Sequence, residues 1–135
     1  MEPIPLIPTF SRTIWCFSPG ESLATALRYM RDEDFSQVVV QQDGVLGLLS
    51  AEGIARWLAD QDGAVDTSAV TVADVIPHEP AGSFRILSAQ QTVSDARAVF
   101  ERGRRVFAVI VTESGDPTET PLGLVTPWDV LEEEP

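Results

Sequence analysis

An internal repeat is the feature that most limits what this chain can fold into. Matching stretches open at Ser18 and, 70 residues later, at Ser88, and each passes through a helical pattern into an apolar run. Each copy then reaches the element Gly-Leu-x-[Ser/Thr], at residues 47–50 and 123–126. A repeated supersecondary unit buries its apolar face against its neighbour. The sequence therefore predicts a pseudo-twofold module with a cleft between the two copies.

Each copy is predicted to run strand, helix, strand, strand, helix, with a weak leading strand at 13–17 or 85–87. The helix that follows has apolar residues spaced along one face. These are Leu23, Ala26, Leu27 and Met30 in the first copy, and Val93, Ala96, Val99 and Phe100 in the second. The apolar runs at 36–41 and 105–112 predict strands that are buried on both faces. A second strand follows at 45–49 or 122–125, and closing helices are predicted at 51–60 and from Pro127.

These elements place the fold in the α/β class, as an α+β arrangement with a mixed sheet and two β-α-β-β-α repeats. We assign residues 1–70 to repeat 1, with an N-terminal segment and a linker, and residues 71–135 to repeat 2, with a short acidic tail. The length of 135 residues suffices for a core without metal or disulfide.

The composition argues against several classes of partner. The chain carries 21 acidic and nine basic residues, for a net charge of −12, so nucleic acid and anionic lipid are both repelled. No run approaches the ~18 apolar residues that would span a bilayer. The amino terminus is acidic and rich in proline, unlike a signal peptide. The single cysteine, Cys16, fits a reducing compartment. We therefore expect a cytoplasmic protein with no nucleic-acid or membrane partner.

The residue inventory also argues against catalysis. One histidine, His78, and one cysteine cannot supply a zinc site, and a charge-relay triad would depend on His78 alone. His78 lies in a connector flanked by proline and is expected to be an exposed loop residue. We predict a protein that is not an enzyme, binds no metal and needs no cofactor.

The sharpest local element runs from Thr126 through Pro127 to Asp129. Threonine before a helix, proline at its first position and an acid at its third form a helix-start signature that needs no ligand. The same geometry suits a ligand, because free N–H groups at a helix start attract phosphate and a carboxylate accepts from a ribose diol. The sequence leaves both interpretations open. The first copy keeps a hydroxyl at Ser50 but has Gly53 in the position of the acid.

The doubled pattern resembles the tandem CBS (cystathionine-β-synthase) domain pair, or Bateman module. The resemblance spans roughly residues 9–131 and depends on the order and duplication of four stretches. They are Gly-Leu-Val-Thr-Pro-Trp-Asp-Val at 123–130, Gly-Leu-Leu-Ser-Ala-Glu-Gly-Ile at 47–54, Phe-Ser-Gln-Val-Val-Val at 35–40 and Thr-Val-Ala-Asp-Val-Ile at 71–76. In this family, adenosine-type ligands lie in the cleft between the repeats.

The resemblance implies a set of ligand-binding residues in this chain. Thr126 would contact phosphate and Asp129 the ribose, while Arg104 or Arg105 would neutralise the phosphate. The base would lie near four residues: Ile86, Leu87, Ile76 and Pro77. Gly53 departs from the family pattern by removing the ribose acceptor of the first repeat, so that site is expected to be weak or empty.

Two functional hypotheses follow. In the first, the chain is a regulatory module that senses an adenine nucleotide or adenosyl ligand of the AMP, ADP, ATP or S-adenosylmethionine class. In the second, it is a ligand-free dimerisation or scaffold domain, which the missing acid at Gly53 and the acidic surface favour. The resemblance implies a homodimer in either case.

Overall fold

The computed structural model describes residues 3–103 and 105–131, and the chain divides into two compact units. The first-repeat unit is Trp15–Ala81, and the second-repeat unit is Met1–Ile14 with Gly82–Pro135. This division differs from the sequence-based boundary at residue 70 in two segments. Residues 71–81 join the first repeat because Val72 and Val75 are buried in its core. Residues before Trp15 join the second repeat because Leu6 is fully buried in that core.

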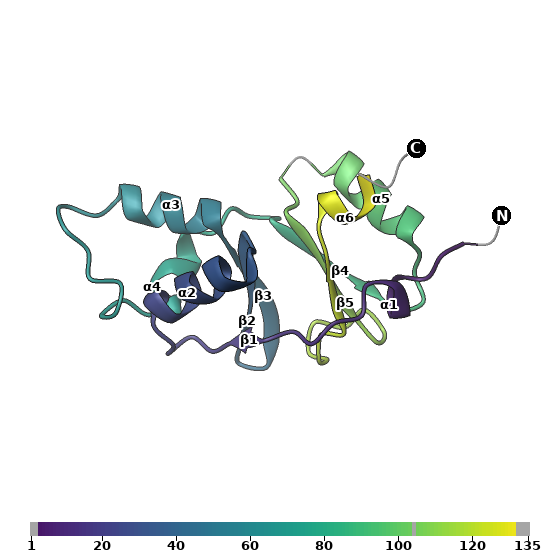
Figure 1. The fold of residues 1–135 in the computed structure, drawn as a ribbon, viewed down its shortest axis with the longest axis horizontal. Helices are drawn as coiled ribbons and strands as arrows, with labels where there is room; N and C mark the ends of the chain where they lie inside the picture. Colours follow the sequence, from purple (N-terminus) through teal and green to yellow (C-terminus); the bar gives the residue numbers. More distant parts are fainter. Residues whose placement is uncertain (1–2, 104, 132–135) are drawn as a thin grey trace. The chain divides into compact units, whose positions relative to one another are not determined.

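The first-repeat unit is a three-stranded sheet with helices on one face (Figure 1). Its elements are β1 (Cys16–Phe17), α2 (Leu23–Glu33), β2 (Gln37–Gln42), β3 (Val45–Ser50), α3 (Ala51–Ala59), α4 (Val72–Val75) and the short 3-10 helix η1 (Ile76–His78). The central strand β2 pairs parallel with β1 and antiparallel with β3. Val38 and Val40 face the helices, while Val39 on the opposite face is also buried, which confirms a strand covered on both sides.

The start of α2 shows how local sequence sets an element's limits. Ser22 caps the helix, because its hydroxyl accepts a hydrogen bond from the Thr25 N–H at 3.1 Å. Ser18 instead donates its N–H to the Glu21 carboxylate at 2.7 Å, which orders the turn before the helix. The helix ends at Asp34, whose backbone is left-handed, with φ of 57°.

The second-repeat unit repeats this topology. Its elements are α1 (Leu6–Thr9), β4 (Phe84–Ser88), α5 (Val93–Arg102), β5 (Ala108–Thr112), β6 (Gly123–Val125) and α6 (Pro127–Leu131). Strand β5 is central, parallel to β4 and antiparallel to β6, and one row across the sheet joins Ile86, Ile110 and Leu124. Helices α1, α5 and α6 all contribute to one apolar core. Two mixed sheets with the same strand order confirm the predicted fold class.

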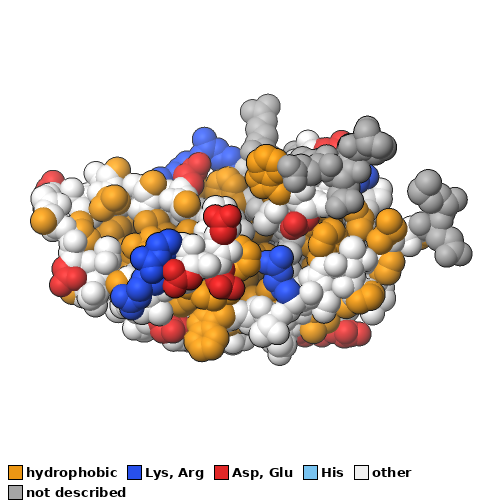
Figure 2. Space-filling view, viewed as in Figure 1, with side chains coloured by type: hydrophobic (Ala, Val, Ile, Leu, Met, Phe, Trp, Pro, Cys, Tyr) orange, Lys and Arg blue, Asp and Glu red, His pale blue; other side chains and the backbone are white. Residues whose placement is uncertain are grey.

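The described residues carry many charged side chains on their surface. Acidic and basic side chains are scattered over the face drawn in Figure 2, with apolar side chains between them. No helix in the part of the chain that the structure describes has the length and apolar character needed to cross a bilayer.

The long loop of the second repeat is ordered by its own carboxylates. Ser114 donates its N–H and its hydroxyl to Glu119 at 2.9 and 2.8 Å. Thr118 donates its N–H and its hydroxyl to Asp116 at 2.9 and 2.7 Å. Hydrogen bonds to the charged form lower the pKa of Asp116 below its ordinary 3.8 and that of Glu119 below its ordinary 4.5.

The order of this loop is therefore expected to depend on acid pH. A carboxylate whose pKa is depressed by folding stabilises the folded loop above its ordinary pKa, and this stabilisation is lost as the pH falls through the folded value. Amide NMR shifts of Ser114 and Thr118, followed from pH 7 to pH 2, should titrate with midpoints below 4.5 and 3.8 respectively. Ser114→Ala should raise only the Glu119 midpoint. Midpoints at the ordinary values would contradict this account of the loop.

Candidate functional site

Each repeat has a junction at which its last strand passes directly into its last helix. In the second repeat, β6 ends at Val125 and Thr126 leads into α6. One oxygen of Asp129, Oδ2, accepts the Thr126 N–H at 2.7 Å and the Thr126 hydroxyl at 3.1 Å. The Asp129 N–H in turn donates to the Thr126 carbonyl at 3.0 Å. The predicted pair is therefore brought together, and it closes the first turn of the helix.

This arrangement defines what the second junction is able to bind. The Thr126 hydroxyl donates to Asp129, so it would have to rotate before donating to a phosphate. Both residues are half-buried, and neither Asp129 oxygen is among the buried side-chain atoms without a partner in the described residues. The carboxylate is thus positioned by the backbone while its second oxygen, Oδ1, keeps acceptor capacity.

The other predicted site residues are spread over both units. Ile86 and Leu87 lie half-buried on β4, which is separated from β6 by the central strand, a spacing of roughly 10 Å. Arg105 is exposed in the turn before β5, at the sheet end where Thr126 also lies, and Arg104 is outside the described residues. Ile76 packs against the first-repeat core and Pro77 is exposed, both in η1 of the first-repeat unit.

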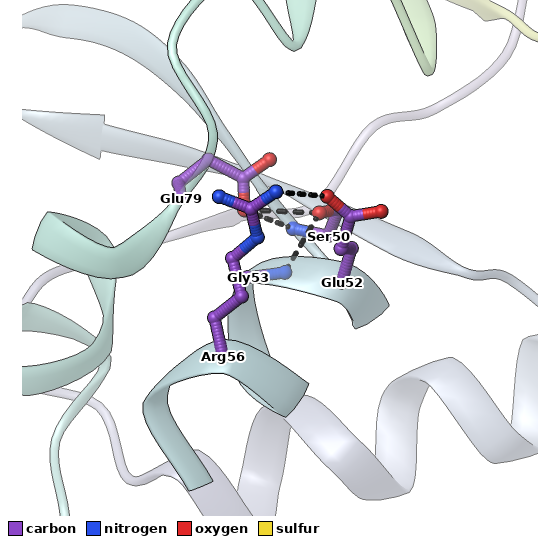
Figure 3. A network of polar contacts seen from close by, with 5 residues as sticks. All are labelled: Ser50, Glu52, Gly53, Arg56 and Glu79. Atoms are coloured by element: carbon purple, nitrogen blue, oxygen red, sulfur yellow. Dashed lines mark hydrogen bonds and ion pairs between the residues drawn. The ribbon is translucent and has the colours of Figure 1, made fainter. Parts of the chain in front are cut away.

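The junction of the first repeat contains a carboxylate that the sequence analysis missed. Ser50 ends β3, and its hydroxyl accepts the Gly53 N–H at 3.1 Å, which caps α3. The Ser50 N–H and hydroxyl both donate to Oε1 of Glu79, at 2.8 and 3.0 Å (Figure 3). Glu79 follows η1, 29 positions along the chain from Ser50. A distant glutamate thus accepts from Ser50 exactly the pair of donors that Asp129 accepts from Thr126.

Gly53 makes this contact sterically feasible. A Cβ on residue 53 would overlap Oε1 of Glu79 and lie 3.2 Å from the Glu79 Cα. A side chain at this position and the present position of Glu79 therefore exclude each other. A glycine inside a helix costs about 0.5–1 kcal/mol relative to alanine, and this unfavourable choice was the sequence signal that another group approaches closely.

The carboxylate of Glu79 is only partly satisfied. Its second oxygen, Oε2, is buried and has no hydrogen-bond partner among the described residues. On α3, Arg56 forms an ion pair with Glu52, one turn earlier, at 3.0 Å (Figure 3). An unpaired buried acceptor costs about 1–3 kcal/mol, so the contact carries a penalty beside its two hydrogen bonds.

The described residues contain no group of three or more His, Cys, Asp and Glu side chains that could hold a metal ion. His78 was expected to be an exposed loop residue, but it ends η1 with a side chain 30% exposed, and its Nδ1 lies 3.5 Å from Asp60. Burial raises the pKa of the Cys16 thiol, which disfavours the reactive thiolate.

Comparison with known proteins identifies the fold. The CBS domain family model matches residues 10–60. The chain contains a CBS domain. A search of the curated proteins gives no match.

Solved CBS structures resemble the chain over nearly its whole length. The CBS domain of a bacterial CNNM/CorC family Mg²⁺ transporter, in complex with ATP, is 23% identical, with a TM-score of 0.68 and 96% of this chain and 86% of that one covered. Hypoxic Response Protein I, solved with two zinc ions, is 21% identical, with a TM-score of 0.65 and coverage of 93% and 95%. A hexameric CBS-CP12 protein from bloom-forming cyanobacteria is 14% identical, with a TM-score of 0.73 and coverage of 98% and 73%. At these identities the likeness establishes the fold.

The exclusion between residue 53 and Glu79 predicts that the two positions are coupled in a double-mutant cycle. Gly53→Ala in the wild-type chain should lower the free energy of unfolding by about 1–3 kcal/mol because its Cβ overlaps Glu79. In a Glu79→Ala background, the same substitution should cost less, because the overlap with Oε1 is gone and only the 3.2 Å approach to the Cα of residue 79 remains. Urea unfolding measures both values.

Gly20 offers a control for this cycle, because a Cβ there meets nothing within 4 Å. Gly20→Ala should show no coupling to Glu79→Ala. Equal effects of Gly53→Ala in the two backgrounds would disprove the steric link.

Proposed function

We propose that this CBS protein is a regulatory, non-catalytic module that binds an adenine nucleotide or adenosyl ligand at the junction of its second repeat. The observation that carries the proposal is the Thr126–Asp129 pair, in which a carboxylate is fixed by the backbone N–H of the residue that begins the helix. The ATP complex of the CNNM/CorC CBS domain supports this class of ligand.

Different residues would contact the ribose, the phosphate and the base of the ligand. Asp129 accepts from the ribose hydroxyls through Oδ1, while Oδ2 keeps its bond from the Thr126 N–H. The Thr126 hydroxyl turns from Asp129 to the phosphate, and Arg104 or Arg105 neutralises its charge. Ile86 and Leu87 on β4 contact the base. Ligand binding would act by favouring one conformation of the module, which a separate partner protein reads.

A second candidate function rests on a specific observation. The hydroxyls of Ser50 and Thr126 both donate to carboxylates of the chain itself. These groups are therefore satisfied without a ligand, as expected of a ligand-free dimerisation domain. Trp128 on α6 is 71% exposed, as a residue at a subunit interface would be in an isolated chain. We expect a homodimer under either function, and the hexameric CBS-CP12 structure shows that a protein of this fold assembles.

Nucleotide-dependent stability tests the proposal. AMP, ADP, ATP, S-adenosylmethionine and NAD should be compared in thermal unfolding, and a ligand at 100 times its Kd should add about 2.7 kcal/mol. For a domain of this size the shift in Tm is on the order of 10 °C. Asp129→Ala should abolish the shift.

A matched control separates ligand binding from helix capping. Asp95 accepts the Thr92 N–H at 2.9 Å and caps α5 in the same unit. Asp95→Ala should lower the unliganded Tm, as Asp129→Ala does, but it should keep the nucleotide shift. No shift with any ligand would favour the dimerisation domain, and a shift that survives Asp129→Ala would place the site elsewhere.

A further inference from the structure

The two junctions satisfy the same donors with carboxylates of different origin. In the second repeat the acid is Asp129, which belongs to α6 itself. In the first repeat it is Glu79, which lies outside α3 on the segment that follows η1. Asp129 stays within one helical turn of its donors in any rotamer, whereas Glu79 lies on a separate segment and can leave Ser50 without any change in α3. The contact between Glu79 and Ser50 can therefore break while α3 stays intact.

The position of Glu79 blocks the groups that an anionic ligand would need. Its Oε1 takes both the N–H and the hydroxyl of Ser50, and this hydroxyl corresponds to the donor that the proposed function assigns to phosphate at Thr126. Gly53 removes the side chain that would otherwise keep the Glu79 backbone away from α3. Ser50 is 3% exposed, so the donors have little contact with solvent while Glu79 is in place.

The contact also has a built-in weakness. Oε2 of Glu79 is buried without a hydrogen-bond partner in the described chain, whereas neither oxygen of Asp129 is in that state. That buried, unpaired oxygen carries a desolvation penalty, which is relieved when Glu79 leaves the junction and Oε2 reaches water. Glu79 is thus held firmly enough to occupy the junction, yet it remains displaceable.

We propose that Glu79 is an internal occupant of the first-repeat junction, a carboxylate that holds the Ser50 donors and keeps this repeat closed to phosphate-bearing ligands. A nucleotide then binds the second repeat alone, and the first becomes available when Glu79 withdraws. The inference rests on the proposed function in taking a nucleotide as the ligand.

Binding of ATP to Glu79→Ala tests the inference. Isothermal titration should give one ATP per chain for the wild type and two for Glu79→Ala. In ¹⁵N spectra, ATP should shift the Ser50 and Gly53 amides only in the variant. Glu52→Ala is the matched control, since it removes an acid from the first turn of α3 that pairs with Arg56 at 3.0 Å. It should bind one ATP.

Combining variants separates this inference from the proposed function. Asp129→Ala should bind no ATP, and Asp129→Ala with Glu79→Ala should bind one, located by the Ser50 amide. If the wild type binds none but Glu79→Ala binds one at Ser50, the proposed function fails and the inference stands. ATP shifts at Ser50 in the wild type, or none at Ser50 in Glu79→Ala, would overturn the inference.

A milder variant guards against loss of folding. Glu79→Gln keeps the length of the side chain and one carbonyl acceptor but removes the charge, so it should open the first junction with an affinity lower than in Glu79→Ala. Circular dichroism checks that each variant is folded. A folded Glu79→Gln in which saturating ATP leaves the Ser50 amide unmoved would also overturn the inference.

Discussion

The structure depends on one interaction made twice, a carboxylate oxygen that accepts both the N–H and the hydroxyl of the residue between the last strand and the last helix. At Thr126 the acceptor is Asp129, and at Ser50 it is Glu79. The contact fixes the direction in which each helix leaves its sheet, because the N–H groups of the first helical turn have no partner within the helix. It also decides which polar groups remain for a ligand. Stability and binding thus compete for the same atoms.

The buried core of each unit holds the strand that leads into this junction. Strands β2 and β5 are central and buried on both faces, so their valines and isoleucine hold the neighbouring strand that carries the hydroxyl residue. In the second-repeat unit, the N-terminal segment completes the core, with the Leu6 N–H donating to the Gln91 carbonyl at 2.8 Å and the Val93 N–H to that of Ile4 at 2.8 Å. In the first, α4 serves a similar purpose through Val72 and Val75. Each junction is therefore built on a rigid sheet.

Periodicity and repetition predicted the elements because those signals are local. The helix faces of α2 and α5, the buried strands and the Thr126–Asp129 pair all depend on residues within one turn or one strand of each other. The contacts that sequence reasoning missed join distant positions: Glu79 reaches Ser50 across 29 residues, and Leu6 reaches the second-repeat core across the whole first repeat. Comparison of the repeats placed Gly53 where the second repeat has an acid, but the carboxylate that Glu79 supplies there is visible only in three-dimensional contacts. Only the glycine's unfavourable place in a helix hinted at it.

A crystal structure of the wild-type chain grown with ATP tests the central claim most directly. The account predicts nucleotide density at Thr126 and Asp129, with the ribose on the free oxygen of Asp129 and Oε1 of Glu79 still on the N–H of Ser50. Nucleotide density on the Ser50 N–H with Glu79 displaced would contradict the claim that an internal carboxylate closes the first repeat. Nucleotide density at neither junction, in crystals grown at an ATP concentration that saturates binding in solution, would contradict the assignment of the ligand site itself.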